Sequence, residues 1–448
     1  MEVVLEQMLA ARETRAMRQT SLHREYGLPI ISFCMNIPGP VKDTPLIRRG
    51  FLSGCAMLDA QLPGEAIRYR QVFPAVTGWE AFYVLDLPAL QIKKITTVIE
   101  DSLPLGRLFD MDVLTEDLTK LDRDEVGGKS RDCIVCGAAG RGCASRRTHS
   151  VAELQQATRE ILTRHFARED AERIGARAVQ SLLDEVDTTP KPGLVDCRNN
   201  GSHKDMDRAM FYASARALQS YFHRCARIGM QTAAQSPQAT FHQLRTAGLQ
   251  AEQEMFAVTG GVNTHKGAIF TLGLLCGAAG RLWNPVSGWD PDALCAEVAR
   301  MTASTILKDF EAGQADTVGR RLFAERGIQG IRGEVARGLP SVGSFGLPLF
   351  LDLTRRGLSA EQAGAVTLLH LICRVEDTNL IGRGGPEGAG QAREQVQSLL
   401  EAQDLPSREQ LEALDDWFIA RNLSPGGCAD LLAAIYFVKQ LACEGQPD

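Results

Sequence analysis

The chain has 448 residues, of which 44% are hydrophobic and 23% are charged. This composition is ordinary for a soluble enzyme, and the length exceeds one core, since domains hold roughly 100–200 residues. The formal net charge of −6 excludes the broad basic surface that nucleic-acid binding needs, so we expect no nucleic-acid partner. The net charge does not exclude a local anion site, because a few cations and backbone N–H groups are enough to bind phosphate.

The cysteines and the apolar runs bear on location. The 12 cysteines lie mostly in apolar or helical surroundings, and the opening stretch MEVVLEQMLAARETR lacks the pattern of a secretory signal. The longest weakly polar run, 267–280, is shorter than the roughly 18 residues that span a bilayer. We therefore expect a cytoplasmic protein with free thiols, no membrane association and a buried core helix at 267–280.

The first third of the chain alternates helical and strand-like segments. Residues 1–26 predict a helix on which arginines recur every three residues, as either a solvated face or a phosphate-binding row. A strand is expected at 29–35, one or two strands at 67–87, a helix at 89–101 and a further strand within 106–114. This β–α–β-like order predicts an α/β first module.

From residue 151 onward the pattern becomes helical. Residues 151–186 follow a helical spacing, and beyond them alanine- and leucine-rich segments are separated by Gly, Pro and Asn. We expect a mostly α-helical second module. The change of character places a boundary near residue 168, which gives modules 1–168 and 169–448.

Four punctuated segments of the second module carry polar residues beside glycines: 189–196 with 201–206, 260–268, 375–379 with 383–385, and 424–430. In the second segment, His265 and Lys266 stand where a helix begins, and free N–H groups there suit a polyphosphate. The spacing is not that of a Walker A loop. A capped helix with a surface lysine explains the same pattern.

The third and fourth segments supply carboxylates. Glu376 and Asp377 follow an apolar stretch, where they either lie at a solvated helix end or bind a metal, a cation or a base. Asp430 stands before the apolar run 431–438, where it either favours the helix dipole or holds Mg²⁺ against phosphates.

Taken together and in this order, the segments TPKPGLVD…GSHKDM, GVNTHKGAIF, EDTN…RGG and SPGGCADLLA resemble the triphosphoribosyl-dephospho-CoA synthase family. The resemblance runs from about residue 170 to 440. It implies that ATP and 3'-dephospho-CoA give 2'-(5''-triphosphoribosyl)-3'-dephospho-CoA, with adenine leaving. Ribosyl transfer of this kind passes through an oxocarbenium-like transition state.

That chemistry needs a carboxylate to accept a proton or stabilise the ribosyl cation, cations for the triphosphate, and a donor for adenine. We assign substrate binding to Lys191, His203, Asn263, His265, Lys266, Asn379, Arg383 and Asp430, and metal or general-base duty to Asp196, Asp205, Glu376 and Asp377.

The first module resembles a second family, the apo-citrate lyase phosphoribosyl-dephospho-CoA transferases. The matching blocks are Arg18-Gln19, SFCMNIPGPVK at 32–42, GRLFDMDV at 106–113 and the cysteine segment 133–149. The resemblance implies a nucleotidyltransferase-like module. It would transfer the phosphoribosyl-dephospho-CoA group to a serine of the acyl carrier protein, the gamma subunit of citrate lyase, with release of pyrophosphate.

Asp110 and Asp112 alternate on a predicted strand and so share one face. Two carboxylates on one face are either solvated or hold a Mg²⁺ ion that stabilises the attacking and leaving oxygens, and the resemblance favours Mg²⁺. We assign Arg18, Lys42 and Arg107 to the triphosphate.

Three cysteines and a histidine follow within seventeen residues, at Cys133, Cys136, Cys143 and His149. Such a set can form a tetrahedral Zn²⁺ site. The alternative is a phosphate-binding or carrier-docking loop with free thiols.

Two other functions fit parts of the pattern. One is an ATP-dependent kinase or adenylyltransferase with a helical regulatory half, which would release ADP or AMP. The other is a nucleotide sensor with an interaction module, which would bind ATP without turnover. If both resemblances hold, fusion raises the concentration of the first product near the second site.

Overall fold

The computed structural model describes residues 1–138, 143, 146–311 and 318–443. The chain divides into two compact units, Met1–Phe166 and Ala167–Asp448. One long helix, α5 (Val151–Asp187), contributes its first part to the N-terminal unit and its remainder to the C-terminal unit.

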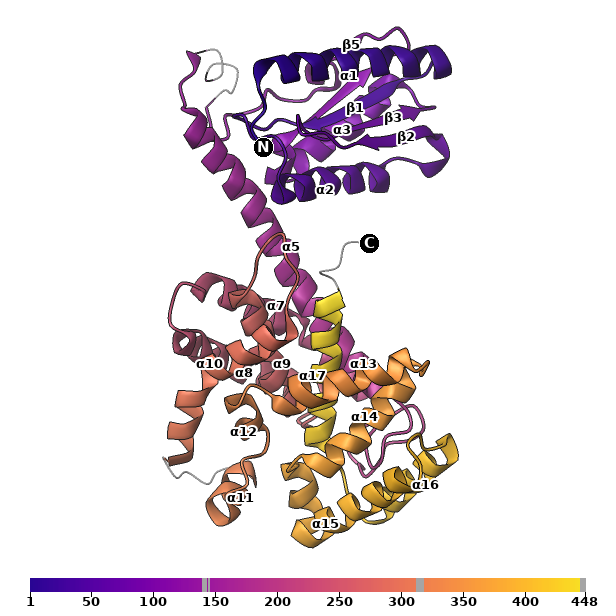
Figure 1. Cartoon of the computed structure of the whole chain (residues 1–448), viewed down its shortest axis with the longest axis vertical. Helices are drawn as coiled ribbons and strands as arrows, with labels where there is room; N and C mark the ends of the chain where they lie inside the picture. The colour runs from indigo at the N-terminus through magenta and orange to yellow at the C-terminus, as the bar shows by residue number, and fades with distance from the viewer. Residues whose placement is uncertain (139–142, 144–145, 312–317, 444–448) are drawn as a thin grey trace. The chain divides into compact units, whose positions relative to one another are not determined.

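The N-terminal unit is a five-stranded sheet with helices (Figure 1). The strand order is β2-β3-β1-β4-β5, and every ladder is antiparallel. Its elements are α1 (Leu5–Tyr26), β1 (Ile30–Met35), α2 (Pro45–Gln61), β2 (Ile67–Phe73), β3 (Glu80–Leu85), α3 (Ala89–Ser102), β4 (Phe109–Leu114) and β5 (Lys120–Leu121), with 3₁₀ turns at Gly64–Ala66, Pro104–Leu108 and Arg123–Val126.

The two faces of this sheet differ because side chains alternate along each strand. One face is apolar, and Phe33 stacks on Phe51 of α2 with ring centroids 4.9 Å apart. The other face is half apolar, where Leu22 of α1 packs on Phe82. Its remaining half carries Cys34 opposite Asp110 and is therefore polar.

The edge of the sheet at β4 is only partly paired, since β5 covers Val113 and Leu114 alone. Side chains satisfy the uncovered backbone: Glu100 of α3 accepts the Met111 N–H at 3.0 Å, and Arg131 donates to the Phe109 carbonyl at 2.6 Å. These bonds occupy polar groups that an open edge would otherwise present.

All the regular secondary structure in the described residues of the C-terminal unit is helical. Beyond α5 its helices are α6 (Arg208–Ala217), α7 (Gln219–Thr232), α8 (Pro237–Val258), α9 (Lys266–Arg281), α10 (Pro291–Glu311), α11 (Val318–Arg326), α12 (Gly330–Ala336), a π-helical turn Ser341–Gly346, α13 (Leu347–Arg355), α14 (Ala360–Arg374), α15 (Thr378–Ala402), α16 (Arg408–Ala420) and α17 (Gly426–Cys443).

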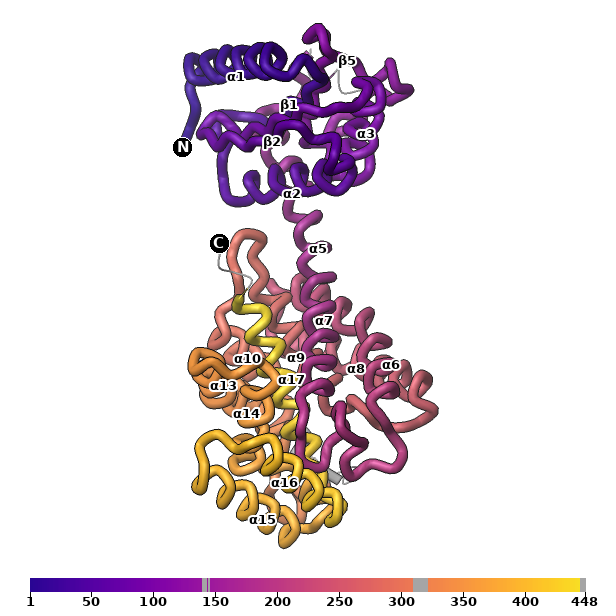
Figure 2. Tube along the Cα trace, turned by 90° about the vertical axis from the view of Figure 1, so that its right-hand side faces the viewer, coloured from indigo at the N-terminus to yellow at the C-terminus, as the bar shows by residue number. Residues whose placement is uncertain are grey.

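Helices α9 and α17 form the centre of this unit, and α7 and α14 pack against them (Figures 1 and 2). Almost every residue of α9 between Ala268 and Gly280 is buried, as expected for the run 267–280. Among the described helices, α17 alone is long and apolar enough to meet the criteria for a membrane span. Because most of its side chains lie in the core of the unit, α17 has the character of a core helix.

The observed fold corrects two expectations. The first module does combine helices with a sheet, but the ladders are antiparallel, so it is not built from parallel β–α–β crossovers. The short connection between β2 and β3 permits an antiparallel hairpin, whereas a parallel pair needs a long crossover. The sequence predicts Asp430 at the start of the last helix. This helix instead begins at Gly426, four residues earlier, so Asp430 lies in its second turn.

Candidate active site

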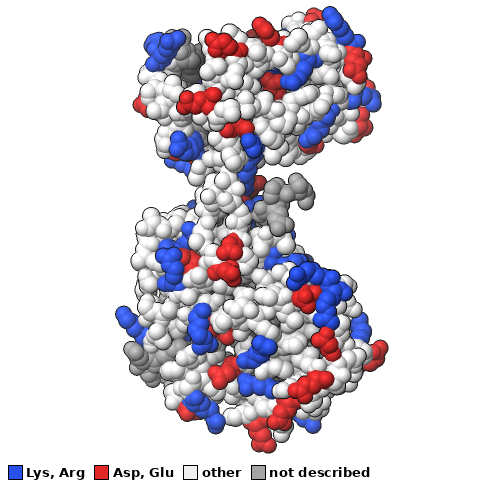
Figure 3. All heavy atoms as spheres, in the orientation of Figure 1, with Lys and Arg blue, Asp and Glu red and all other residues white. Residues whose placement is uncertain are grey.

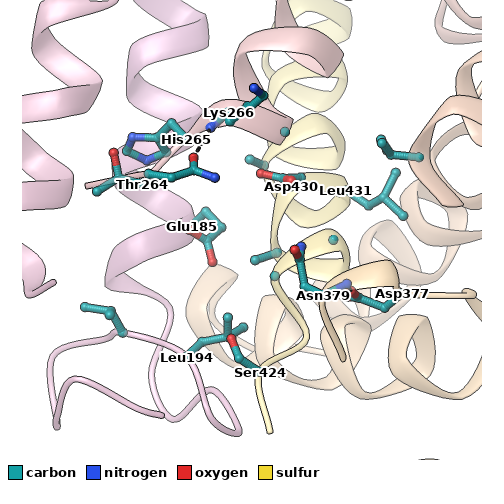
Figure 4. Close-up of a pocket in the computed structure, with 18 of the residues that line it drawn as sticks. Glu185, Leu194, Thr264, His265, Lys266, Asp377, Asn379, Ser424, Asp430 and Leu431 are labelled. Carbon is teal, nitrogen blue, oxygen red and sulfur yellow. Dashed lines mark hydrogen bonds between the residues drawn. The ribbon is translucent and has the colours of Figure 1, made fainter. Parts of the chain in front are cut away.

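A pocket of about 420 Å³ opens in the C-terminal unit, a size within the range of small-ligand sites (roughly 300–1,000 Å³). Residues from α5, the loop 189–206, the start of α9, the 375–379 segment and α17 line it (Figure 4). It brings together all but one of the residues assigned to this module from the sequence: Lys191, His203, Asp205, Asn263, His265, Lys266, Glu376, Asp377, Asn379, Arg383 and Asp430.

Asp196 is the residue that does not line this pocket. Asp196 is 3% exposed, and its carboxylate accepts backbone N–H groups from Lys191 at 2.9 Å, Arg198 at 2.7 Å and Asn199 at 3.1 Å. These bonds fold the 189–199 loop on itself. In this structure Asp196 shapes the loop that carries Lys191.

Lys191 is a buried cation with a partner of its own. Its Nζ lies 2.5 Å from Glu185 Oε1 and 2.7 Å from the Glu185 carbonyl oxygen, and both side chains are almost fully buried. Desolvation raises the pKa of Glu185, and the charge of Lys191 opposes that rise. The charge of Lys191 is therefore already balanced before any phosphate enters.

His265 lines the pocket and keeps one ring nitrogen without a partner in the protein. Its Nδ1 lies 2.8 Å from Ser214 Oγ, which itself accepts the Thr264 hydroxyl at 2.8 Å, so the Ser214 hydrogen is directed to Nδ1. Nε2 is buried and has no hydrogen-bond partner in the protein. Burial lowers the pKa of His265 to about 3, with Lys191 adding to the effect. A neutral ring with N–H at Nε2 follows, which makes His265 a hydrogen-bond donor without a charge.

His203 is held between two side chains at the pocket wall. Arg383 donates to its Nδ1 at 3.0 Å, and its Nε2 lies 3.0 Å from Ser424 Oγ. Burial and the nearby Arg383 lower its pKa to about 4. His203 is therefore neutral, and Arg383 is the charged member of the pair.

The two neighbouring carboxylates of the third segment have different surroundings. Asp377 is 2% exposed and caps α15, accepting N–H groups from Asn379 at 2.8 Å and Leu380 at 3.1 Å. It also accepts the N–H of Cys428 in α17 at 2.9 Å, and this bond ties the two helices together. Glu376 is exposed and lines the pocket, so its carboxylate is available to a ligand.

Asp430 lies against the first turn of α9 (Figure 4). A Cβ placed on Gly267 would stand 1.9 Å from Asp430 Oδ2, so only glycine permits this approach. Asp430 accepts the Ala268 N–H, and burial with nearby Glu185 and Asp377 raises its pKa well above the usual value. Lys266, on the same turn, pairs with Glu252 at 2.8 Å.

The pocket lining holds more acidic than basic side chains. It includes the carboxylates of Glu185, Asp205, Glu334, Glu376, Asp377 and Asp430, whereas the permanent cations are Lys191, Lys266 and Arg383. Three cations, of which Lys191 is already paired with Glu185, are too few to neutralise a triphosphate. Oxygen-rich sites of this kind suit Mg²⁺, which binds through a few carboxylates together with substrate phosphates.

Sequence reasoning missed two of these carboxylates. Glu185 lies on the buried stripe of α5, three residues after Leu182 and next to Val186, and an acidic residue at such a position is a detectable signal. Glu334 accepts the Ser341 hydroxyl at 3.0 Å and lies on the short helix α12, where no sequence pattern marks it.

In the N-terminal unit, Asp110 and Asp112 lie on one face of β4 as predicted. Asp110 Oδ2 is 3.9 Å from Cys34 Sγ, and Lys120 pairs with Asp112 at 2.6 Å. Desolvation raises the pKa of Asp110, and Asp112 adds to the rise. Asp110 and Asp112 therefore place two carboxylates on one strand face, and carboxylate pairs of this kind can hold a cation.

The three cations assigned to this unit do not converge. Arg18 bonds to Glu80 at 3.2 Å and covers the Phe73 ring at 4.1 Å. Lys42 donates to the Ile37 carbonyl and lines a small cavity beside Trp79. Arg107 lies in a separate groove.

That groove is basic. Together with Arg107, it is lined by Lys94, Arg123, Lys129 and Arg131, against the two carboxylates of Asp101 and Asp132. Burial lowers the pKa of Arg107, and Arg131 and Arg123 lower it further. Crowded cations of this kind favour an anionic ligand.

The ligand atoms of Cys133, Cys136, Cys143 and His149 all lie within 4.8 Å of one another. On the face shown in Figure 3, basic and acidic side chains are interspersed on each unit.

Comparison with known proteins assigns both units. Residues 171–447 match the family described as ATP:dephospho-CoA triphosphoribosyl transferase, and residues 3–165 match Apo-citrate lyase phosphoribosyl-dephospho-CoA transferase. With the pocket above, these matches define a transferase made of two catalytic units. The chain belongs to the ATP:dephospho-CoA triphosphoribosyl transferase family and carries an apo-citrate lyase phosphoribosyl-dephospho-CoA transferase region before it.

Relatives with both regions match nearly the whole chain. "Protein CitXG" of Haemophilus influenzae is 36% identical over 452 residues, covering 97% of this chain and 96% of the relative. "Protein CitXG" of Leuconostoc mesenteroides subsp. cremoris is 32% identical over 461 residues, covering 98% and 97%. The "2-(5''-triphosphoribosyl)-3'-dephosphocoenzyme-A synthase" of Klebsiella pneumoniae is 40% identical over 273 residues, covering 60% of this chain and 90% of its own length.

Proposed function

We propose that the chain makes the prosthetic group of citrate lyase and then attaches it. In the C-terminal unit, the 2'-hydroxyl of 3'-dephospho-CoA attacks C1' of ATP, adenine leaves, and the triphosphate stays on the transferred ribose. In the N-terminal unit, a serine of the acyl carrier subunit attacks the α-phosphate, and pyrophosphate leaves. The observation that carries this proposal is the carboxylate-lined pocket at the start of α9, within the region of the synthase family.

The residues of the pocket fit distinct tasks in ribosyl transfer. Departing adenine gains a proton or a hydrogen bond on nitrogen, and the neutral His265 offers an N–H at Nε2 for that purpose. Arg383 and Lys266 are the cations nearest to solvent and suit the triphosphate. Mg²⁺ bound by the acidic lining would supply the remaining positive charge.

Glu376 is the best-placed general base. The attacking hydroxyl must lose its proton, and the exposed carboxylate of Glu376 is free to take it. The oxygens of Asp377 are engaged by backbone N–H groups, so we assign Asp377 to positioning α15 and α17. Asp205, also exposed, and Asn263 and Asn379 complete the polar lining.

The assignment is tested by adenine release. Purified protein is incubated with ATP, 3'-dephospho-CoA and Mg²⁺, and the bases and nucleotides are separated by chromatography. We expect free adenine, with a loss of about 10²–10⁴-fold in Glu376→Gln, the usual contribution of a general base. ADP or AMP as the product would instead favour a kinase or an adenylyltransferase, and near wild-type rates in both Glu376→Gln and Asp377→Asn would refute the assignment.

For the N-terminal unit we propose a nucleotidyltransferase-like reaction in which Asp110 and Asp112 hold Mg²⁺. Their shared face and their proximity support a metal pair. The three cations Arg18, Lys42 and Arg107 line different surfaces. A single bound triphosphate would therefore contact only one of them. Of the three, Arg107 has the most cationic surroundings.

Asp110→Asn separates the two reactions. We expect it to stop transfer to the carrier protein and to leave adenine release unchanged, as followed by the mass of the carrier and by chromatography. Loss of both reactions would contradict the assignment of one reaction to each unit.

We further propose a cytoplasmic enzyme. This location is consistent with cysteines that are all unpaired among the described residues.

A further inference from the structure

The cysteine segment of the N-terminal unit stands apart from the chemistry proposed above. We propose that Cys133, Cys136, Cys143 and His149 hold a structural Zn²⁺ ion and that this ion fixes the wall of the neighbouring basic groove, which is lined by Lys94, Arg107, Arg123, Lys129 and Arg131.

The distances fit one tetrahedral ion. Cys136 Sγ lies 3.5 Å from Cys143 Sγ and 3.3 Å from His149 Nε2. A tetrahedral Zn²⁺ with Zn–S bonds of about 2.3 Å and Zn–N bonds of about 2.0 Å has edges of roughly 3.5–3.8 Å. The observed separations are close to those edges and far above the roughly 2.0 Å of a disulfide.

The backbone around the first two ligands is shaped for a metal. Gly137 has φ +70° and donates its N–H to the Cys133 carbonyl at 3.0 Å, while Cys133 donates to Ala138 at 2.7 Å. The N–H groups of Val135 and Cys136 are directed at the Cys133 sulfur. This tight turn presents both sulfurs of the Cys-x-x-Cys pair to one point, and its N–H groups stabilise a thiolate.

The same segment leads directly from the basic groove. Arg131 and Asp132, which line the groove, immediately precede Cys133. Arg131 is anchored to the Phe109 carbonyl at 2.6 Å, Arg123 donates to the Lys129 carbonyl at 2.9 Å, and Arg107 bonds to the Asp132 carbonyl. Segment 129–132 thus carries or accepts bonds from all three arginines. An ion that holds Cys133 therefore also holds the C-terminal end of this segment.

His149 fixes the other end of the segment. The next residue, Ser150, caps α5 through two reciprocal bonds with Glu153. The Glu153 N–H donates to Ser150 Oγ at 3.2 Å, and the Ser150 N–H donates to the Glu153 carboxylate at 2.8 Å. The ion would thus join the groove wall to the start of a capped helix.

Arg123 and Arg131 also pair with Glu100, and the positive charge of the groove still exceeds its negative charge, which suits a polyphosphate. The identity of this polyphosphate as the triphosphate of the transferred group rests on the proposed function.

Metal analysis of the purified full chain tests the site. We expect about one equivalent of zinc per chain, which Cys136→Ser removes and Cys443→Ser retains, since four ligands including both sulfurs of the turn are needed. Cys443 is an exposed thiol at the end of α17 and serves as the matched control. Cobalt(II) added to stripped protein should give the visible bands of tetrahedral thiolate coordination.

Binding of inorganic tripolyphosphate tests the link to the groove. By calorimetry we expect the zinc-loaded protein to bind at least tenfold more tightly than the stripped protein, and Arg107→Ala to weaken binding in the loaded form. Less than a tenth of an equivalent of zinc, or iron in its place, overturns the metal assignment. Equal tripolyphosphate affinity with and without zinc overturns the coupling. Neither result depends on adenine release, so failure here is distinct from failure of the proposed function.

Discussion

The buried ion pair between Lys191 and Glu185 gives the most quantitative prediction. The side chains are 1% and 6% exposed, with Nζ and Oε1 2.5 Å apart. In Glu185→Gln the buried Lys191 side chain loses its counter-ion, and removing one member of a buried ion pair costs about 3–5 kcal/mol. For a unit of this size, that cost corresponds to a fall in melting temperature of roughly 5–10 °C, as measured by calorimetry of the full chain.

Two further variants make this prediction refutable. Glu172→Gln removes a carboxylate from the same helix, where Glu172 pairs with Arg168 at 3.1 Å on an exposed face, and should change stability by no more than about 0.5 kcal/mol. Glu185→Gln combined with Lys191→Met removes both charges and should recover most of the loss. If Glu185→Gln is no more destabilising than Glu172→Gln, the pair is not buried as described.

Two other predictions concern the pocket. The pKa of His265 is lowered to about 3 in the folded unit, whereas a free histidine titrates near 6.5, so the unfolded chain binds more protons between these values and stability must fall as pH drops below about 6.5. His265→Gln should flatten this decline in urea-unfolding curves taken from pH 7 to pH 4, and an unchanged slope would contradict the burial of the ring. Gly267→Ala places a methyl group 1.9 Å from Asp430 Oδ2 and should displace that carboxylate and lower adenine release at least tenfold, measured as above. Gly390→Ala, in helix α15 with open space around it, should be neutral or stabilising by up to about 1 kcal/mol, and equal effects of the two substitutions would refute the steric argument.

Local patterns in the sequence were sufficient for features that depend on neighbours along the chain. The helical spacing of 151–186 corresponds to α5, and the apolar run 267–280 to the buried part of α9. The alternation of Asp110 and Asp112 gave their common face correctly, because side chains alternate on any strand.

Features that depend on distant partners could not be predicted. The antiparallel pairing of β1 with β4 joins strands far apart in sequence, and the order of the elements alone is compatible with parallel pairing. The contact between Asp430 and the first turn of α9 likewise joins segments from two helices. The difference between Glu376 and Asp377 depends on which backbone N–H groups surround each carboxylate, and Cys428, one of these donors, lies in α17.

The position of α17 at the centre of the C-terminal unit also bears on how the unit assembles during synthesis. Helices α9 and α14 pack on a segment that the ribosome makes after every other described helix, so their apolar faces have no native cover until residues 426–443 emerge. The N-terminal unit ends at Phe166 and is therefore complete well before α17 is made. We therefore expect nascent chains that have not yet released α17 to expose the α9 face to chaperones.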